Sequence, residues 1–332
     1  MPADSPTLTQ DKFETQQRSV PLHLSAAATS PEARRSRSIF QRMRTAQPFR
    51  STKRKASPQP VAPVSTLERL PGLSLLRYQA FGISLASVVP LEGLQSDLSA
   101  GDSPVDLSIT LGGLPSQPEN WLTFEVPGAG SFYCDRLGTS IILQAAKGVS
   151  AHELSDMLTS AAIPAALWLR GHFVLDAFAA VLPGRSQALV FAGLHEEDQS
   201  ALVRSLAASG CQILGEQLVS VRVHQHAVQV SGLSGSQPAD KAHTLGAIVI
   251  LDSASTCTTS SLVGLSSRGG LAALLRSRHR PAVLNPLGSE ALLLPRFAQL
   301  ARAVPTHTWS VPHGSTHGAL LQMSALDKLI AL

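Results

Sequence analysis

Charged side chains are scarce in this sequence, at 15% of 332 residues, and aromatic side chains are scarcer still, at 5%. The only cysteines, Cys134, Cys211 and Cys257, lack the spacing of a metal site and cannot form a closed disulfide framework. There is no apolar run of about 18 residues or more, and no apolar signal-peptide core at the N-terminus. These absences exclude a disulfide-stapled domain and a transmembrane helix, and we expect a cytoplasmic protein.

Hydrophobic residues make up 44% of the chain, which is enough for a large core. The formal charge of +4 is unevenly distributed, because nine Lys or Arg and no acid lie between Arg34 and Lys55. Residues 1–72 are rich in Ser, Pro, Gln and Arg, and we expect a disordered basic extension there. It could contact an acidic surface. Its basic run at 51–55 has no interleaved aromatics, so a specific nucleic-acid module is not predicted.

The patterning predicts a mixed α/β (α+β) fold with two parts. In residues 73–148 polar and apolar side chains alternate, as in Asp106–Leu111 and Trp121–Val126, which predicts a small β-rich subdomain of antiparallel hairpins. In residues 149–332 the capping-box spacing of Ser150 and Glu153 begins a helix that we expect to run to Leu169. The patterning further predicts strands at 173–181, 187–192, 211–214, 218–224 and 245–251, and helices at 198–208, 270–279, 295–303 and 317–331.

One predicted strand–loop–helix unit, at residues 189–202, resembles a phosphate-binding loop whose chemistry is reversed. Gly193 and Ser200 are in register with the pattern G-x-x-x-x-G-K-[ST]. Asp198 occupies the position of the pattern's second glycine, and Gln199 occupies the position of its lysine. Asp198 also ends a run of three acids, and each carboxylate about 4 Å from a phosphate charge costs on the order of 4 kcal/mol at an effective dielectric near 20. The loop therefore disfavours the ligand that its layout suggests.

The order of these segments resembles the HPr kinase/phosphorylase-related serine kinases, whose catalytic domain is similar to that of phosphoenolpyruvate carboxykinase. The resemblance covers residues 73–330 and consists of many weak motifs in order rather than one specific motif. The segments that carry it are Tyr78–Leu91, Phe124–Phe132, Arg170-Gly171, Gln187–Val221, Leu245–Leu251 and Phe297–Pro305. It implies a P-loop-type kinase-like domain with a mixed sheet after the β-rich subdomain.

Most of the family's functional residues are replaced in this sequence. Its loop resembles G-x-S-G-x-G-K-S-T, and only Gly193 and Ser200 keep the family's residue types here. The altered positions are Glu196, Asp198, Gln199 and Ala201. The family's downstream pair of aspartates corresponds to Glu216 and Gln217, and its upstream histidine corresponds to Asp176. We therefore interpret all these positions as remnants of a nucleotide site.

These replacements predict a pseudokinase that acts as a protein-binding or peptide-binding scaffold, with no cofactor and no metal. The carboxylates of residues 196–198 would then cap the helix N-terminus themselves. The alternative is an ATP-dependent and Mg-dependent serine kinase with a non-standard loop, in which Glu216 holds the metal and Arg204 replaces the lysine. An adaptor that works through its basic extension is a third possibility.

Two other groups of polar residues are candidate sites. The pair His224 and His226, with His243 nearby, lacks the further ligands that a zinc site needs. Residues 253–261 form a polar segment after a strand, and a surface loop is the expectation there. The nucleophile motif G-x-S-x-G is absent. Neither group changes the interpretation above.

Overall fold

The computed structural model describes residues 75–94, 96, 104–113, 115, 117, 121–126, 129–193, 196–224, 227–233, 242–252, 261–281 and 290–310. For residues 196–198 and 290–292 it describes the backbone alone. The chain divides into units at 1–44 and 45–332, and all described residues belong to the second. The basic extension, the polar loop at 253–260 and the helix predicted at 317–331 lie outside the described residues.

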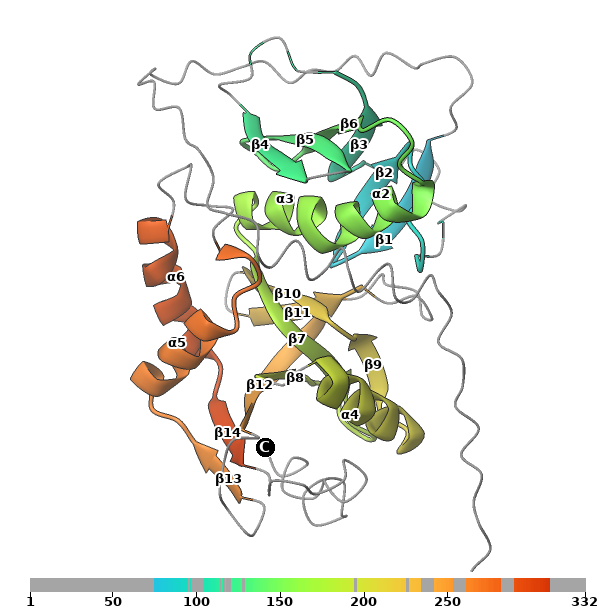
Figure 1. Ribbon diagram of the computed structural model, residues 1–332. Helices are drawn as coiled ribbons and strands as arrows, with labels where there is room; N and C mark the ends of the chain where they lie inside the picture. Colours follow the sequence, from blue (N-terminus) through green and yellow to red (C-terminus); the bar gives the residue numbers. More distant parts are fainter. Residues whose placement is uncertain are drawn as a thin grey trace, which may run out of the picture. The chain divides into compact units, whose positions relative to one another are not determined.

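The first sheet has six strands in the order β1-β2-β3-β6-β5-β4 (Figure 1). Its strands are β1 (Leu76–Ala80), β2 (Ile83–Ser87), β3 (Leu107–Leu111), β4 (Trp121–Val126), β5 (Gly130–Asp135) and β6 (Ser140–Ala145). The prediction of antiparallel hairpins is wrong for β3, which pairs in parallel with both β2 and β6. Alternation of side chains reports which face is buried, but it is the same for either strand direction.

A helical segment lies along one face of this sheet (Figure 1). It consists of α2 (Ala151–Met157), a π-helical turn η2 (Leu158–Ala162) and α3 (Ile163–Leu169). The predicted capping box is confirmed: Ser150 Oγ accepts from the N–H of Glu153, and the Ser150 N–H donates to Glu153 Oε2. The predicted continuous α-helix is interrupted because Pro164 has no N–H to donate to the carbonyl of Ser160, four residues earlier.

The second sheet has eight strands, in the order β11-β10-β7-β8-β12-β14-β13, with β9 paired to β7. Its strands are β7 (Phe173–Val181), β8 (Ala188–Ala192), β9 (Gln212–Gly215), β10 (Leu218–His224), β11 (Ala227–Gly232), β12 (His243–Asp252), β13 (Ser261–Gly264) and β14 (Thr306–Ser310). The long strand β12 pairs in parallel with β8 and β14, while its first residues pair antiparallel with β11. The expected mixed α/β fold is thus confirmed by two mixed sheets.

Three helices accompany the second sheet: α4 (Glu196–Ala208), α5 (Ser267–Arg276) and α6 (Glu290–Ala303). All three begin earlier than predicted, and α5 runs over Ser267–Arg276 rather than 270–279. Helix α6 continues through Pro295 rather than starting at it, and α4 starts at Glu196 rather than Asp198. No helix among the described residues is long and apolar enough to cross a membrane.

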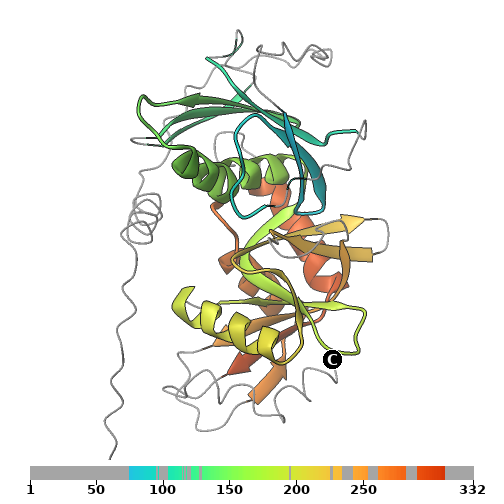
Figure 2. The same cartoon turned by 90° about the vertical axis from the view of Figure 1, so that its right-hand side faces the viewer.

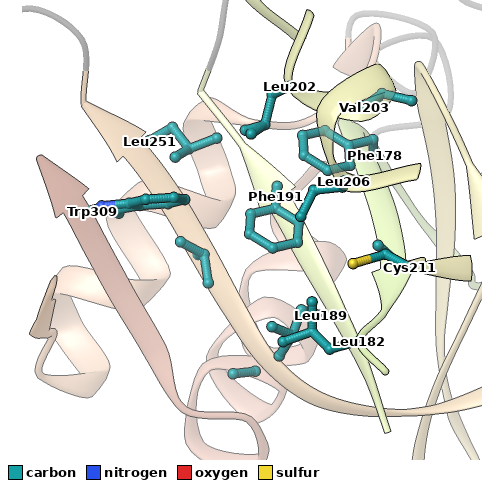
Figure 3. Packing of buried hydrophobic residues seen from close by; sticks show 13 residues of the cluster. Phe178, Leu182, Leu189, Phe191, Leu202, Val203, Leu206, Cys211, Leu251 and Trp309 are labelled. Carbon is teal, nitrogen blue, oxygen red and sulfur yellow. The ribbon is translucent and has the colours of Figure 1, made fainter. Parts of the chain in front are cut away.

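The core of the second sheet fixes α4 against the strands (Figure 3). The rings of Phe178 on β7 and Phe191 on β8 stack with their centroids 4.7 Å apart and an interplanar angle of 9°. Leu202, Val203 and Leu206 of α4 are buried in the same cluster. Each such side chain contributes about 1.5–3 kcal/mol when fully buried. This packing places the N-terminal end of α4 at the end of β8.

The two sheets are joined at the β1–β2 turn (Figure 2). Phe81 and Gly82 form this two-residue turn with φ of 54° and 72°, the left-handed conformation that such hairpins use. The Phe81 N–H donates to the carbonyl of Gly232 on β11 at 3.1 Å, and the Phe81 side chain is fully buried. The strained phenylalanine therefore anchors one sheet to the other.

Candidate functional site

The positions that match the family's nucleotide loop, residues 193–201, lie where β8 continues into α4. Gly193 follows β8 directly, with φ of +94°. A Cβ at this position would lie 2.8 Å from the carbonyl oxygen of Leu251 on β12. Backbone geometry alone thus requires a glycine here. Its agreement with the phosphate-loop pattern is no sign of a bound phosphate.

The segment between Gly193 and α4 is short. Only residues 194 and 195 separate them, because α4 begins at Glu196. In the pattern G-x-x-x-x-G-K-[ST] the residues before the lysine form an open loop whose N–H groups surround the phosphates. Here positions four to six of that pattern are already the first turn of a helix. The predicted capping by the side chains of residues 196–198 lies outside the described side chains.

The residue at the lysine position makes an internal contact. Gln199 Nε2 donates to the backbone carbonyl of Glu216, in the turn between β9 and β10. This turn contains Glu216 and Gln217, the positions that the resemblance matches to the family's pair of aspartates, and both are exposed. The Gln199 amide thus connects α4 to that turn. Arg204, the alternative cation, donates from Nε to the carbonyl of Ser200 within α4.

Asp176 lies beside these residues on β7. Its neighbour Ala177 pairs with Ala192 of β8, and the Ala177 N–H donates to the carbonyl of Gln217 at 3.1 Å. The structure therefore brings Asp176, the end of β8 and the β9–β10 turn together. Ala201 belongs to the first part of α4, and Ser200 there is exposed.

Sequence reasoning missed the histidine that contacts Asp176. His279, in the segment after α5, places Nδ1 2.6 Å from Asp176 Oδ1 and Nε2 2.8 Å from the carbonyl oxygen of Ser160. The carbonyl can only accept, and it is the one that Pro164 leaves without its helical donor. Because the two partners are 103 residues apart, no local pattern signals the contact.

Other histidines do not form a metal site among the described residues. No group of three or more His, Cys, Asp or Glu side chains with metal-ligand geometry occurs there. His224 is exposed near the end of β10, and His243 begins β12, opposite Val230. His226 and Cys257 lie outside the described residues. Cys134 and Cys211 are buried thiols, and burial raises the pKa of each.

A second buried histidine, His172, lies between α3 and β7. Its Nδ1 is 2.8 Å from Ser220 Oγ on β10. Burial lowers the pKa of His172 to about 4, and the positive charges of Arg222 and Arg170 add to the shift. Since its ordinary value is 6.5, this ring is neutral in the folded protein near pH 7.

We expect the depressed pKa of His172 to make the fold acid-sensitive. The unfolded chain takes up this proton near pH 6.5, but the folded chain takes it up only near pH 4. The contribution of His172 to the free energy of unfolding is therefore fully present above pH 6.5 and is lost as the pH falls from 6.5 to about 4. The residue should account for a loss of about 2 kcal/mol in the free energy of unfolding between about pH 7 and pH 4.5. Urea unfolding of the wild type and His172→Asn at both pH values measures it.

The Asn variant should lose less stability on acidification than the wild type, by that amount. His224→Asn serves as a control, because His224 is exposed and its removal should leave the pH dependence as it was. Equal acid sensitivity of His172→Asn and the wild type would show that His172 titrates normally.

No protein-family model matches the sequence, and no curated protein matches it. Among solved structures, the chain is similar to the Hpr(Ser) kinase/phosphatase from Coxiella burnetii, with 9% sequence identity and a TM-score of 0.30. The similarity covers 48% of this chain and 97% of that one. It is a weak structural neighbour with a kinase-like fold, and nothing about activity follows from it.

Proposed function

We propose that this chain is a kinase-like protein that does not transfer phosphate and acts as a binding or scaffolding subunit for a protein or peptide. The observation that carries the proposal is the contact of Gln199 with the Glu216 carbonyl. The side chain that would have to neutralise phosphate charge is uncharged, and it connects two parts of the fold. Positioning and charge neutralisation of the phosphates account for most of phosphoryl-transfer catalysis.

The early start of α4 supports the same proposal. Once residues 196–198 are helical, their N–H groups point along the helix axis and cannot wrap around a triphosphate. The acids at these positions add repulsion at the helix N-terminus. A nucleotide would have to unwind the first turn of α4 and displace the Gln199 contact before it could bind.

Thermal unfolding in the presence of Mg-ATP tests this proposal. We expect no shift of Tm at about 1 mM nucleotide, whereas a site with a Kd of about 10 μM would add about 2.7 kcal/mol of stability. For a folded unit of this size that gain corresponds to a rise of about 5 °C or more. A clear rise, or transfer of the γ-phosphate to a serine peptide, would contradict the proposal and favour the active-kinase alternative.

A variant with the family's residues restored is the complementary test. Gln199→Lys combined with Glu196→Gly and Asp198→Gly returns the cation, removes two acids and loosens the first turn of α4. We expect it to gain stability from Mg-ATP. Ala208→Lys adds the same charge at the exposed far end of α4 and should gain none. If the triple variant folds but ignores nucleotide, the assignment of this loop as a former phosphate site is wrong.

A further inference from the structure

The helix pair α5 and α6 belongs to a part of the chain with an excess of positive charge. Residues 261–310, which include both helices, contain six arginines, no lysine and one acid, Glu290. The six arginines are Arg268, Arg276, Arg278, Arg280, Arg296 and Arg302. Residues 56–260, by contrast, contain 17 acids and nine Lys or Arg. The helix pair is therefore opposite in charge to the part of the chain before it.

The two helices pack against each other and run in opposite directions (Figure 1). The first half of α5 lies beside Thr306, which follows the end of α6. The end of α5 and the middle of α6 both contact the first residues of β7. There the Ser277 carbonyl accepts from the Asp176 N–H at 2.8 Å, and the ring of Phe297 lies 4.7 Å from that of Phe173. The start of α5 and the end of α6 thus lie at the same end of the helix pair.

Three of the six arginines are exposed and have no partner among the described residues. Arg268 lies in the first turn of α5, Arg276 in its last turn, and Arg302 in the last turn of α6. None of these three forms a hydrogen bond or an ion pair within the part of the chain that the structure describes. Arg268 and Arg302 share one end of the helix pair, and Arg276 lies about 12 Å from Arg268 along α5.

Helix stability does not explain the position of Arg268. The positive end of the helix dipole is the N-terminus, so a cation in the first turn is locally unfavourable. The first turn of α5 contains Arg268 and no acid that would offset it. Arg276 and Arg302, in contrast, lie in last turns, where a cation is favourable. Arg268 is therefore a positive charge that disfavours its own helix and is available to an external anion.

We propose that the exposed faces of α5 and α6 bind an acidic segment of a partner protein, whose carboxylates pair with Arg268, Arg276 and Arg302. The planar guanidinium binds a carboxylate through two parallel hydrogen bonds, whereas a lysine ammonium acts as a point charge. An anionic membrane attracts lysine and arginine alike. The absence of lysine from residues 261–310 therefore favours directional pairing with carboxylates over attraction to a lipid surface.

A nucleic acid fits this surface less well than a protein does. The only aromatic residue of the two helices, Phe297, is fully buried, so no ring is available for base stacking. Leu294 of α6 is exposed and offers an apolar contact that a protein segment can use. The inference names the kind of partner that the proposed function leaves open. It rests on that function only in taking the partner to be a protein.

Titration calorimetry of the full chain with a peptide of about ten glutamates tests the inference. At about 50 mM salt, where screening is moderate, we expect saturable binding that weakens with added salt. A thymidine oligonucleotide with the same number of charges and vesicles that contain phosphatidylserine are the competing probes. Absence of saturable peptide binding up to about 1 mM would overturn the proposal.

The decisive variant combines Arg268→Gln, Arg276→Gln and Arg302→Gln. Each exposed ion pair contributes about twofold to binding, so the loss of all three should weaken peptide binding about tenfold. A control variant with Arg185→Gln, Arg204→Gln and Arg222→Gln removes the same charge from exposed positions elsewhere and should weaken it less than about threefold. Both variants keep residues 1–72, so the basic extension contributes equally to both. If the triple variant does not fold, Arg268→Gln alone should still weaken binding about twofold.

Failure of this inference can be told apart from failure of the proposed function. Equal peptide binding by the decisive and control variants would overturn the inference, and so would a decisive variant that loses binding to the oligonucleotide or the vesicles but keeps it for the peptide. Neither result bears on the test with Mg-ATP. A rise of Tm with Mg-ATP would contradict the proposed function, and the peptide titration would still decide whether the helix pair binds an acidic segment.

Discussion

Replacing Gly193 with alanine should lower the free energy of unfolding by about 3 kcal/mol. Two effects add at this position. A φ of +94° is a conformation that alanine rarely adopts, and the new Cβ would lie 2.8 Å from the Leu251 carbonyl oxygen, a backbone atom that cannot rotate away. Urea unfolding at pH 7 measures the loss.

Gly184→Ala is a matched control for this prediction. Gly184 also has a positive φ, +75°, but a Cβ there would have no other atom within 4 Å. It should lose only about 1 kcal/mol, from backbone strain alone. Similar losses in both variants would mean that the approach to Leu251 is unimportant. The prediction bears on function, because it assigns Gly193 to packing rather than to phosphate binding.

The second large effect is expected for His279→Leu, at about 3 kcal/mol of lost stability. His279 is 5% exposed and is the donor to the Ser160 carbonyl. Leucine fills much of the same space but donates nothing, and Pro164 has no N–H with which to replace it. A buried acceptor would be left without a partner, and the side-chain contacts of residue 279 with η2 and with Asp176 of β7 would be lost.

Asp176→Asn separates the two halves of this contact. The Asp176 side chain is 58% exposed, and an asparagine amide can hydrogen-bond to His279 Nδ1 whether that nitrogen donates or accepts. We expect this variant to lose less than about 1 kcal/mol, as is usual for exposed ion pairs. Guanidinium chloride unfolding of both variants gives the comparison. If Asp176→Asn were as damaging as His279→Leu, the ion pair rather than the Ser160 contact would be what stabilises the fold.

Local signals predicted individual elements well. The alternation at Trp121–Val126 and the run at Leu218–His224 have the same bounds in the sequence interpretation as in β4 and β10. The capping box of Ser150 is present as expected. Such signals depend on residues a few positions apart, which contact each other in any fold that contains the element.

Elements whose conformation depends on distant partners were less predictable. Strand β3 pairs in parallel on both sides, although its own sequence alternates like that of a hairpin strand. Helix α6 passes through Pro295, with Phe297 packed edge-on against Phe173 at 4.7 Å. Tertiary packing outweighs local preference in such cases, because burying an aromatic side chain contributes as much as an interior proline costs.

For the candidate site, the amino-acid sequence by itself determined the strand–loop–helix unit after Phe191 and the absence of a positive charge at Gln199. Only the tertiary structure decided what those residues do instead. It joined Gln199 to the Glu216 carbonyl and brought His279 to Asp176 across 103 residues. The physical reason is that hydrogen bonds and charges act through space, and folding brings together groups whose separation along the chain gives no sign of it.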